Sequence, residues 1–191
     1  MKKTIERERT YLAKQLPFDL EKHPCTEIMD LYVPKNSEHA KLRIRMRGGS
    51  YVITKKNPVN ENDPSIQIEQ NIKITKNEFE ALSKSSVDII HKLRFEYPYL
   101  GYTAEIDVFM DKLKGLVLVD VEFTNKAQLT SFKIPDFCLA EVTNEHYLAG
   151  GVLCKETISS LRSKLNSYKY KKLCLKKEPI LTPTKIQKKK K

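Results

Sequence analysis

Residues 42–56 of the chain read LRIRMRGGSYVITKK. In the first half arginine alternates with Leu42, Ile44 and Met46, and apolar and polar residues alternate again in the second half. A period of two is typical of β-strands, whose successive side chains point to opposite faces of a sheet. Because the pair Gly48-Gly49 suits a tight turn, the segment predicts a β-hairpin with one charged and one apolar face.

The same alternation recurs in other parts of the chain. The further predicted strands are Ile5–Leu12, Ser65–Ile72, Lys92–Phe95, Ala104–Val108 and Val119–Phe123. Residues 110–115 are expected to join the last two as a second hairpin, and residues 57–64 to form a polar loop. The sequence therefore predicts an α+β protein that is mainly β.

Helices are predicted in fewer places. Thr75 and Glu78 have the spacing of a capping box, in which each side chain satisfies a free backbone N–H of the other, so a helix is expected from here to about His91. A second helix is expected from near Glu145, and a third over Lys155–Leu173.

The charges on the predicted strands are sorted by sign. Acidic pairs occur at Glu6/Glu8, Glu105/Asp107 and Asp120/Glu122, and basic sets at Arg43/Arg45/Arg47 and Lys92/Arg94. Like charges that neighbour each other on one face repel unless opposite charge lies between them. A closed antiparallel barrel with the charges inside, and the apolar faces packed outward against helices, brings the two signs together and leaves no exposed sheet edge.

Such an interior suits a particular ligand. Arginine and lysine bind phosphate oxygens, and clustered carboxylates bind Mg²⁺ or Mn²⁺. A metal-bridged polyphosphate would neutralise both walls, and phosphoryl transfer depends mainly on positioning and charge stabilisation. The charge pattern therefore predicts a site for a polyphosphate and a divalent cation.

The chain length and charge bound the organisation. With 191 residues we expect one domain, residues 1–173, followed by a Lys-rich disordered tail, residues 174–191. The net charge is +11, but ten lysines and one acid follow Tyr168, so the rest is close to balanced. The tail is expected to be solvated, with a weak, salt-sensitive contact to anionic polymers as the alternative.

The expected compartment is the cytoplasm. No secretory signal and no membrane span are expected, because the chain contains no long apolar run. Its four cysteines show no metal-binding spacing and are expected to be reduced.

The motifs resemble those of the CYTH superfamily, the triphosphate tunnel metalloenzymes. Glu6-Arg7-Glu8 with Thr10 resembles the E-x-E-x-K opening, and Arg43-Ile44-Arg45 the R-x-R strand. The remaining similar motifs are, in order, Thr54-Lys55-Lys56, Glu69, Lys92-Leu93-Arg94, Glu105-Ile106-Asp107, Asp120-Val121-Glu122 and Glu141-Val142-Thr143. The resemblance covers roughly residues 4–165 and rests on motifs that follow in the family's order.

The resemblance implies an eight-stranded antiparallel tunnel with helices outside. It also implies that phosphates are held by Arg43, Arg45, Lys56, Lys92 and Arg94. Metal would be held by Glu6, Glu8, Asp120 and Glu122, with Glu69 and Asp107 as further candidates, and Glu6, Glu8 and Glu122 would serve in catalysis. The attacking water would be activated by metal and carboxylate together, without a covalent intermediate.

The expected activity is metal-dependent hydrolysis of a short-chain triphosphate, inorganic triphosphate first. Thiamine triphosphatase and class IV-type adenylate cyclase activity are the enzymatic alternatives. Thr10 stands where the family has lysine, Asp120 where glutamate is usual and Ala149 near a frequent asparagine. The substitution at Thr10 motivates a further alternative, a non-catalytic binder of polyphosphate or triphosphate, and the Lys-rich tail motivates anchoring to RNA or polyphosphate. The oligomeric state, a dimer included, is left open.

Overall fold

The computed structural model describes residues 3–35, 37–60, 63–84 and 88–177. The strands are β1 (Lys3–Ala13), β2 (Cys25–Val33), β3 (Leu42–Arg47), β4 (Ser50–Asn60), β5 (Asp63–Ile74), β6 (Ile89–Tyr99), β7 (Tyr102–Phe109), β8 (Val117–Glu122) and β9 (Cys138–Glu141). The α-helices are α1 (Lys76–Ser83), α2 (Lys126–Ser131), α3 (Gly150–Leu153) and α4 (Arg162–Ser167). Single 3₁₀ turns are η1 (Leu20–Lys22), η2 (Asp111–Leu113) and η3 (His146–Leu148).

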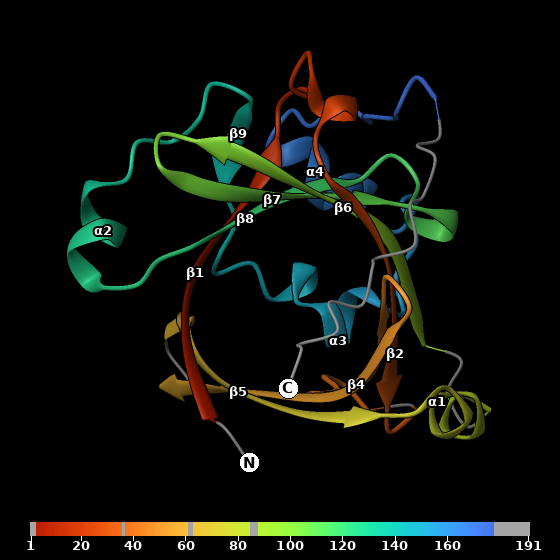
Figure 1. Cartoon of the computed structure of the whole chain (residues 1–191). Helices are drawn as coiled ribbons and strands as arrows, with labels where there is room; N and C mark the ends of the chain where they lie inside the picture. Colours follow the sequence, from red (N-terminus) through yellow and green to blue (C-terminus); the bar gives the residue numbers. More distant parts are fainter. Residues whose placement is uncertain (1–2, 36, 61–62, 85–87, 178–191) are drawn as a thin grey trace.

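Eight antiparallel strands close into a barrel (Figure 1). Their order is β5-β4-β3-β2-β6-β7-β8-β1, and the first half of β1 returns to β5, for example through Glu6 opposite Gln67. The second half of β1 pairs with β8 and also with the short β9, which adds one strand outside the closed ring. The predicted mainly β, eight-stranded antiparallel barrel is therefore confirmed.

The apolar residues form two cores on different sides of the barrel wall. One lies outside β1, β6, β7 and β8, where Val117, Val119 and Val121 are fully buried together with aromatic residues such as Phe132 and Phe137. The other fills one end of the barrel, where Leu12, Phe109 and Leu118 meet side chains from residues 142–170. The first core explains the alternation of apolar and charged residues, and the second closes the barrel at one end.

At this closed end, helix α3 comes very close to β2 and to the segment that precedes β3. A Cβ on Gly151 would lie 2.0 Å from the carbonyl oxygen of Ala40, and one on Gly150 would lie 2.0 Å from the Tyr32 hydroxyl oxygen. Both distances are far below van der Waals contact, so only glycine allows this packing. The α3 segment therefore acts as the floor of the barrel.

The two predicted hairpin turns are confirmed, and one predicted loop is wrong. Gly48 and Gly49 join β3 to β4 with φ of +52° and +81°, in the left-handed region that glycine adopts without cost. Turn η2 joins β7 to β8. Residues 57–60 and 63–64, predicted as loop, instead extend β4 and β5, with Pro58 opposite Gln67. These strand ends were predicted as loop because their residues are polar. Polar residues are tolerated here because one face of the β4–β5 hairpin points into the charged cavity.

The helices are shorter than predicted. The capping box at Thr75 is present, with the Thr75 hydroxyl accepting from Glu78 N–H at 3.2 Å. However, α1 ends at Ser83, and Ile90 and His91 lie in β6. The predicted helix from Glu145 is a 3₁₀ turn followed by α3, and the predicted long helix over residues 155–173 is helical as α4 only at 162–167.

The chain after α4 packs back onto the barrel. Tyr170 accepts a hydrogen bond from Val117 N–H at 2.8 Å and donates one to the Gly115 carbonyl at 2.9 Å. Leu173 N–H also donates to Gly115. Of the predicted tail, residues 178–191 lie outside the described residues, so its disorder stays a prediction. Within the described ranges, no helix is long and apolar enough to cross a membrane.

Candidate functional site: a charged cavity inside the barrel

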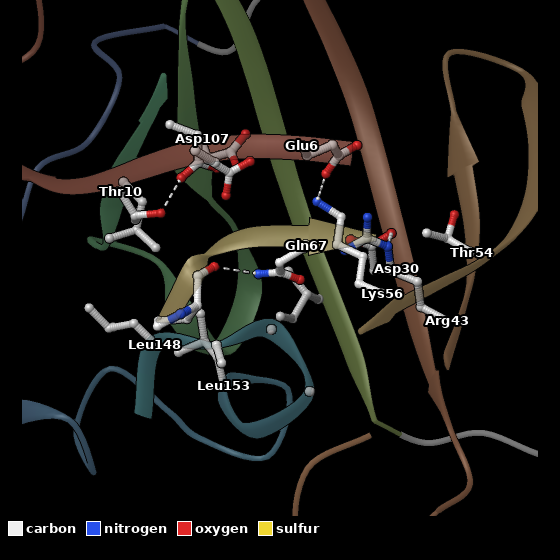
Figure 2. A pocket seen from close by; sticks show the side chains of 18 of the residues that line it. Glu6, Thr10, Asp30, Arg43, Thr54, Lys56, Gln67, Asp107, Leu148 and Leu153 are labelled. Atoms are coloured by element: carbon white, nitrogen blue, oxygen red, sulfur yellow. Dashed lines mark hydrogen bonds and ion pairs between the residues drawn. The ribbon is translucent and has the colours of Figure 1, made fainter. Parts of the chain in front are cut away.

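The barrel encloses a cavity of about 620 Å³ (Figure 2). Every residue predicted for the site lines it: Glu6, Glu8, Arg43, Arg45, Lys56, Glu69, Lys92, Arg94, Asp107, Asp120 and Glu122. They come from seven strands, and within each strand they are spaced two apart, as expected for one face of a sheet. The structure therefore brings together in one cavity all the residues that the sequence selected.

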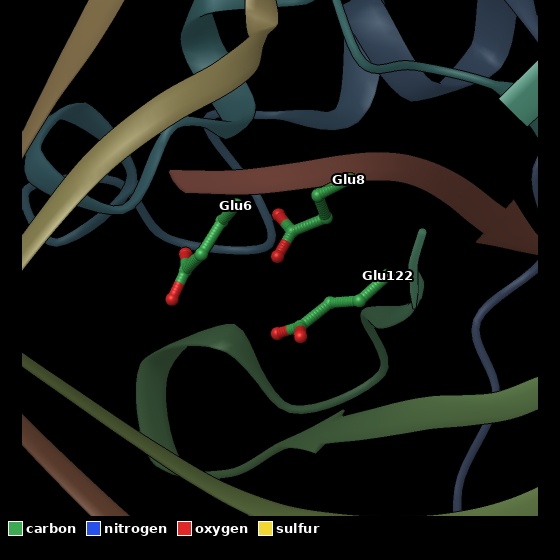
Figure 3. Close-up of side chains that lie close together, drawn as sticks. All are labelled: Glu6, Glu8 and Glu122. Carbon is green, nitrogen blue, oxygen red and sulfur yellow. The ribbon is translucent and has the colours of Figure 1, made fainter. Parts of the chain in front are cut away.

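Three carboxylates converge on one side of the cavity. Glu6, Glu8 and Glu122 each place a carboxylate oxygen within 4.8 Å of the others (Figure 3). Glu8 lies opposite Glu122 in the register of β1 and β8, and Glu6 follows two residues away on the same face. Glu122 is the most exposed of the three, and partial desolvation followed by neighbouring carboxylates raises its pKa, whereas burial raises the pKa of Glu6 against the attraction of Lys56. These charges repel one another unless a cation or protons lie between them.

This donor set fits a divalent cation. Three carboxylate oxygens at such short separation match the oxygen ligands that Mg²⁺ and Mn²⁺ prefer. One oxygen of Glu6, Oε2, lies 2.5 Å from Lys56 Nζ and forms an ion pair with it. A metal bound at this cluster would therefore share Glu6 with Lys56 or displace it.

The basic wall of β3 faces two other acids. Arg45 donates from Nε and Nη2 to the two oxygens of Asp30, at 2.6 and 2.7 Å. Arg43 lies 3.9 Å from Asp30 and donates to Glu69 at 3.4 Å. Lys56 on β4 also reaches Glu69, at 3.4 Å. Glu69, a candidate metal ligand, is therefore an acceptor for two of the predicted phosphate-binding cations.

A second network links β6, β7 and β8. Arg94 donates from Nε and Nη2 to Asp107 at 2.6 Å, contacts Glu105, and reaches Asp120 at 3.2 Å. Lys92 also forms an ion pair with Asp107. Burial alone would raise the pKa of Asp107, but Arg94 and Lys92 outweigh it and lower the pKa to about 2. With two cations already bound, Asp107 is better placed to orient them than to bind metal.

Thr10 lies on β1, two residues after Glu8, and lines the cavity. Its hydroxyl donates to Asp120 at 2.8 Å, and its backbone N–H donates to Thr143 Oγ1 at 3.1 Å. Burial, with Glu8 and Asp107 adding to it, raises the pKa of Asp120 to about 7. Thr10 thus holds this carboxyl through a neutral hydrogen bond, where a lysine would supply a positive charge.

The floor of the cavity is apolar. Ile90, Phe109, Leu118, Leu148 and Leu153 line it and are all buried. His39 and His146 line the cavity too, with their ring centroids 5.1 Å apart. The charged groups that can bind a ligand therefore lie on the barrel wall, away from the apolar floor.

Sequence reasoning missed one buried acid of this site, Asp30. It belongs to β2, which the alternation did not reveal because its inward positions mix Thr26, Ile28, Asp30 and Tyr32. The available signal was the Asp itself in an apolar run, since an isolated acid in a buried strand needs a cationic partner.

Arg47 is more exposed than the other two arginines of β3 and contacts Glu96 at 3.1 Å.

Comparisons with known proteins agree with this fold. The solved structure of the hypothetical protein NE1496 superposes with a TM-score of 0.60 and 26% identity, covering 80% of this chain and 99% of that one. A structure of the inorganic triphosphatase NE1496 gives 0.59 and 24%, covering 78% and 93%. A curated inorganic triphosphatase of Acetivibrio thermocellus is 35% identical over 57 residues, which is 30% of this chain and 35% of that protein. The sequence matches no family model.

The closed eight-stranded barrel, its charged cavity and the ordered motifs resemble those of the tunnel proteins of the CYTH superfamily. Over a stretch of 57 residues the chain is also similar in sequence to a curated inorganic triphosphatase. The aligned stretch spans only about a third of the length of the curated relative that it matches.

Proposed function

We propose that this protein hydrolyses a short-chain triphosphate, inorganic triphosphate foremost, with a divalent cation bound at Glu6, Glu8 and Glu122. The observation that carries the proposal is the cavity itself, in which five cationic side chains face a cluster of three carboxylates. The similarity to inorganic triphosphatases supports the choice of substrate.

The cations would bind the phosphate oxygens from two sides. Arg43 and Lys56 lie on β3 and β4, and Lys92 and Arg94 on β6. All of them are paired with carboxylates in this structure, so phosphate oxygens would replace acceptors such as Glu69 at equivalent positions. Charge-assisted hydrogen bonds in a shielded cavity are strong. The exchange of acceptors would therefore hold the triphosphate in place without a rearrangement of the backbone.

The carboxylate cluster would hold the metal and orient the attacking water. A bound Mg²⁺ or Mn²⁺ supplies charge neutralisation at the phosphates and lowers the pKa of a coordinated water. Glu122 on β8 and Glu8 on β1 face each other across the strand pair, and a carboxylate in this position can accept a proton from water. Arg94 reaches Asp120 at 3.2 Å, and Asp120 lies two residues before Glu122 on β8.

Phosphate release from a substrate panel tests the proposal. The panel contains inorganic triphosphate, ATP and thiamine triphosphate, each with Mg²⁺, with Mn²⁺ or with chelator. We expect metal-dependent release, fastest from inorganic triphosphate. Faster turnover of thiamine triphosphate would replace the proposed substrate, and formation of cyclic AMP would indicate adenylate cyclase.

Thr10 favours a second candidate, a binding protein that retains triphosphate without hydrolysis. Thr10 has no charge with which to orient water, and it is already engaged with Asp120. This reading predicts tight, metal-dependent binding of inorganic triphosphate without phosphate release. A Thr10→Lys variant that gained turnover would then assign the loss of catalysis to this position.

A further inference from the structure

Asp30 is the most deeply buried acid on the basic side of the cavity. It lies on β2 opposite Arg45 in the register with β3, and only 1% of its surface is exposed. Its two oxygens accept from Nε and Nη2 of the same arginine, and Arg43 Nε lies 3.9 Å away. This carboxylate belongs to neither the carboxylate cluster nor the predicted phosphate-binding set.

The paired contact determines how the arginine faces the cavity. A guanidinium held through Nε and Nη2 has a fixed plane, because both bonds lie in that plane. Its third nitrogen, Nη1, is then directed away from Asp30. Arg45 also lines the cavity, and Asp30 uses neither N–H group of Nη1, so Nη1 can donate to a ligand.

The charge of Asp30 is maintained by its surroundings. Burial opposes ionisation, but Arg45 and Arg43 outweigh it, and the pKa of Asp30 lies well below its ordinary value. A buried pair of this kind is costly to break, since either charge alone would be left without compensation. Arg45 is therefore held by a permanent negative charge, whereas Arg43 and Lys56 share the more exposed Glu69.

We propose that Asp30 is a positioning residue, which orients Arg45 so that Nη1 binds a phosphate oxygen of the triphosphate. The inference rests on the proposed triphosphate site. It assigns Arg45 a fixed geometry, while the cations paired with Glu69 exchange partners when the ligand binds.

Removing the charge of Asp30 distinguishes orientation of Arg45 from simple charge compensation, because the two roles predict opposite changes in the affinity for triphosphate. If Asp30 only compensates charge, Asp30→Asn makes the cavity more positive, and an anion binds more tightly. If Asp30 orients Arg45, the same substitution weakens binding in spite of the added positive charge.

The experiment measures the Kd of inorganic triphosphate by calorimetry in the presence of chelator, so that no turnover occurs. For Asp30→Asn we expect Kd to rise roughly tenfold or more, since misplacement of a binding group by about an ångström is costly. Asp111→Asn is the matched control, because it removes one acidic charge at an exposed site outside the cavity and should leave Kd near that of the wild type. An unchanged or lower Kd for Asp30→Asn would overturn the inference.

A second pair of variants covers the case in which Asp30→Asn does not fold. Arg45→Gln is compared with the double variant Asp30→Asn/Arg45→Gln, in which neither buried charge is left alone. Without Arg45 there is nothing to orient, so the double variant should bind triphosphate at least as tightly as Arg45→Gln. Weaker binding by the double variant would show that Asp30 acts independently of Arg45 and would contradict the proposal.

The wild type separates this inference from the proposed function. If it binds no inorganic triphosphate, either with chelator or with Mg²⁺, the proposed function fails, and the inference fails with it. If the wild type binds triphosphate and Asp30→Asn binds it equally well, only the role of Asp30 is wrong.

Discussion

At the scale of single residues, the cavity is organised by carboxylates that each hold more than one cation. Asp30 contacts Arg45 and Arg43, Asp107 contacts Lys92 and Arg94, and Glu69 lies between Arg43 and Lys56. A wall of buried cations would be unstable without such compensation. The acids of the basic wall therefore stabilise the fold before any ligand binds.

The first prediction concerns acid stability. The pKa of Asp107 falls from its ordinary value of 3.8 to about 2 on folding, because Arg94 and Lys92 outweigh burial. A group with a lowered pKa contributes stability above its unfolded value, and this contribution is lost as pH falls toward the folded value. Between pH 5 and pH 2, the free energy of unfolding measured with urea should therefore fall more steeply with decreasing pH for the wild type than for Asp107→Asn.

Two comparisons make the acid-stability prediction specific. Asp111→Asn, at an exposed position on the outer surface, serves as the control for removal of an acid. Parallel stability curves for the wild type and Asp107→Asn across this pH range would show that the ion pairs of Asp107 do not contribute as described.

Most of the site residues could be predicted because they alternate within single strands. Arg43 and Arg45 on β3, and Glu6 and Glu8 on β1, repeat one charge at a period of two, which few other structures require. Asp30 could not be found in this way because its strand has no such repeat. The pairing of the acids with particular cations depends on the barrel register, which joins residues far apart in the chain.

At the scale of elements, sequence reasoning recognised strands better than helices. Strand β2 was missed because its inward face is mixed, and β9 because four residues are too few for a periodic pattern. Residues 155–173 contain apolar side chains at helical spacing, but their burial is achieved by a path of turns against the closed end of the barrel. Tertiary packing thus overrides local helix propensity in this segment.

The second prediction tests the floor of the barrel. Gly151→Ala places a Cβ 2.0 Å from the Ala40 carbonyl oxygen, a backbone atom that cannot yield by side-chain rotation. We expect α3 to shift and the free energy of unfolding to fall by about 1–3 kcal/mol, as measured by urea unfolding. Gly101→Asn, at a hairpin tip where nothing lies within 4 Å of a Cβ, tests a glycine replacement in open space and should cost less. Equal stability of Gly151→Ala and the wild type would contradict the described packing.

The third prediction tests helix α1, which contains no buried residue. Thr75→Ala removes the capping box and should destabilise the protein by about 1 kcal/mol in thermal or urea unfolding. Because α1 contributes no side chain to the cavity, triphosphate binding should not change. Ser83→Ala at the other end of the helix is the control. If it lowers the free energy of unfolding as much as Thr75→Ala does, the effect is not specific to the cap.

At the scale of the whole molecule, the barrel separates two environments. Apolar side chains pack outside the wall and at the closed end, and charged side chains of both signs face the cavity. The overall architecture could be predicted because a closed barrel brings strand faces of one charge next to strand faces of the opposite charge. The location of the apolar floor could not, because it joins Leu148 and Leu153 to side chains of β6, β7 and β8 that lie far away in the sequence.

The rate of phosphate release from inorganic triphosphate by wild type, Glu122→Gln and Glu80→Gln tests the central claim most directly. Glu122 belongs to the carboxylate cluster, whereas Glu80 lies exposed on α1 and is the control for the same chemical change. We predict metal-dependent release by the wild type and by Glu80→Gln, and a loss of at least about a hundredfold for Glu122→Gln. Equal rates for all three proteins, or no release by the wild type with either metal, would contradict the assignment of this cavity as a triphosphatase site.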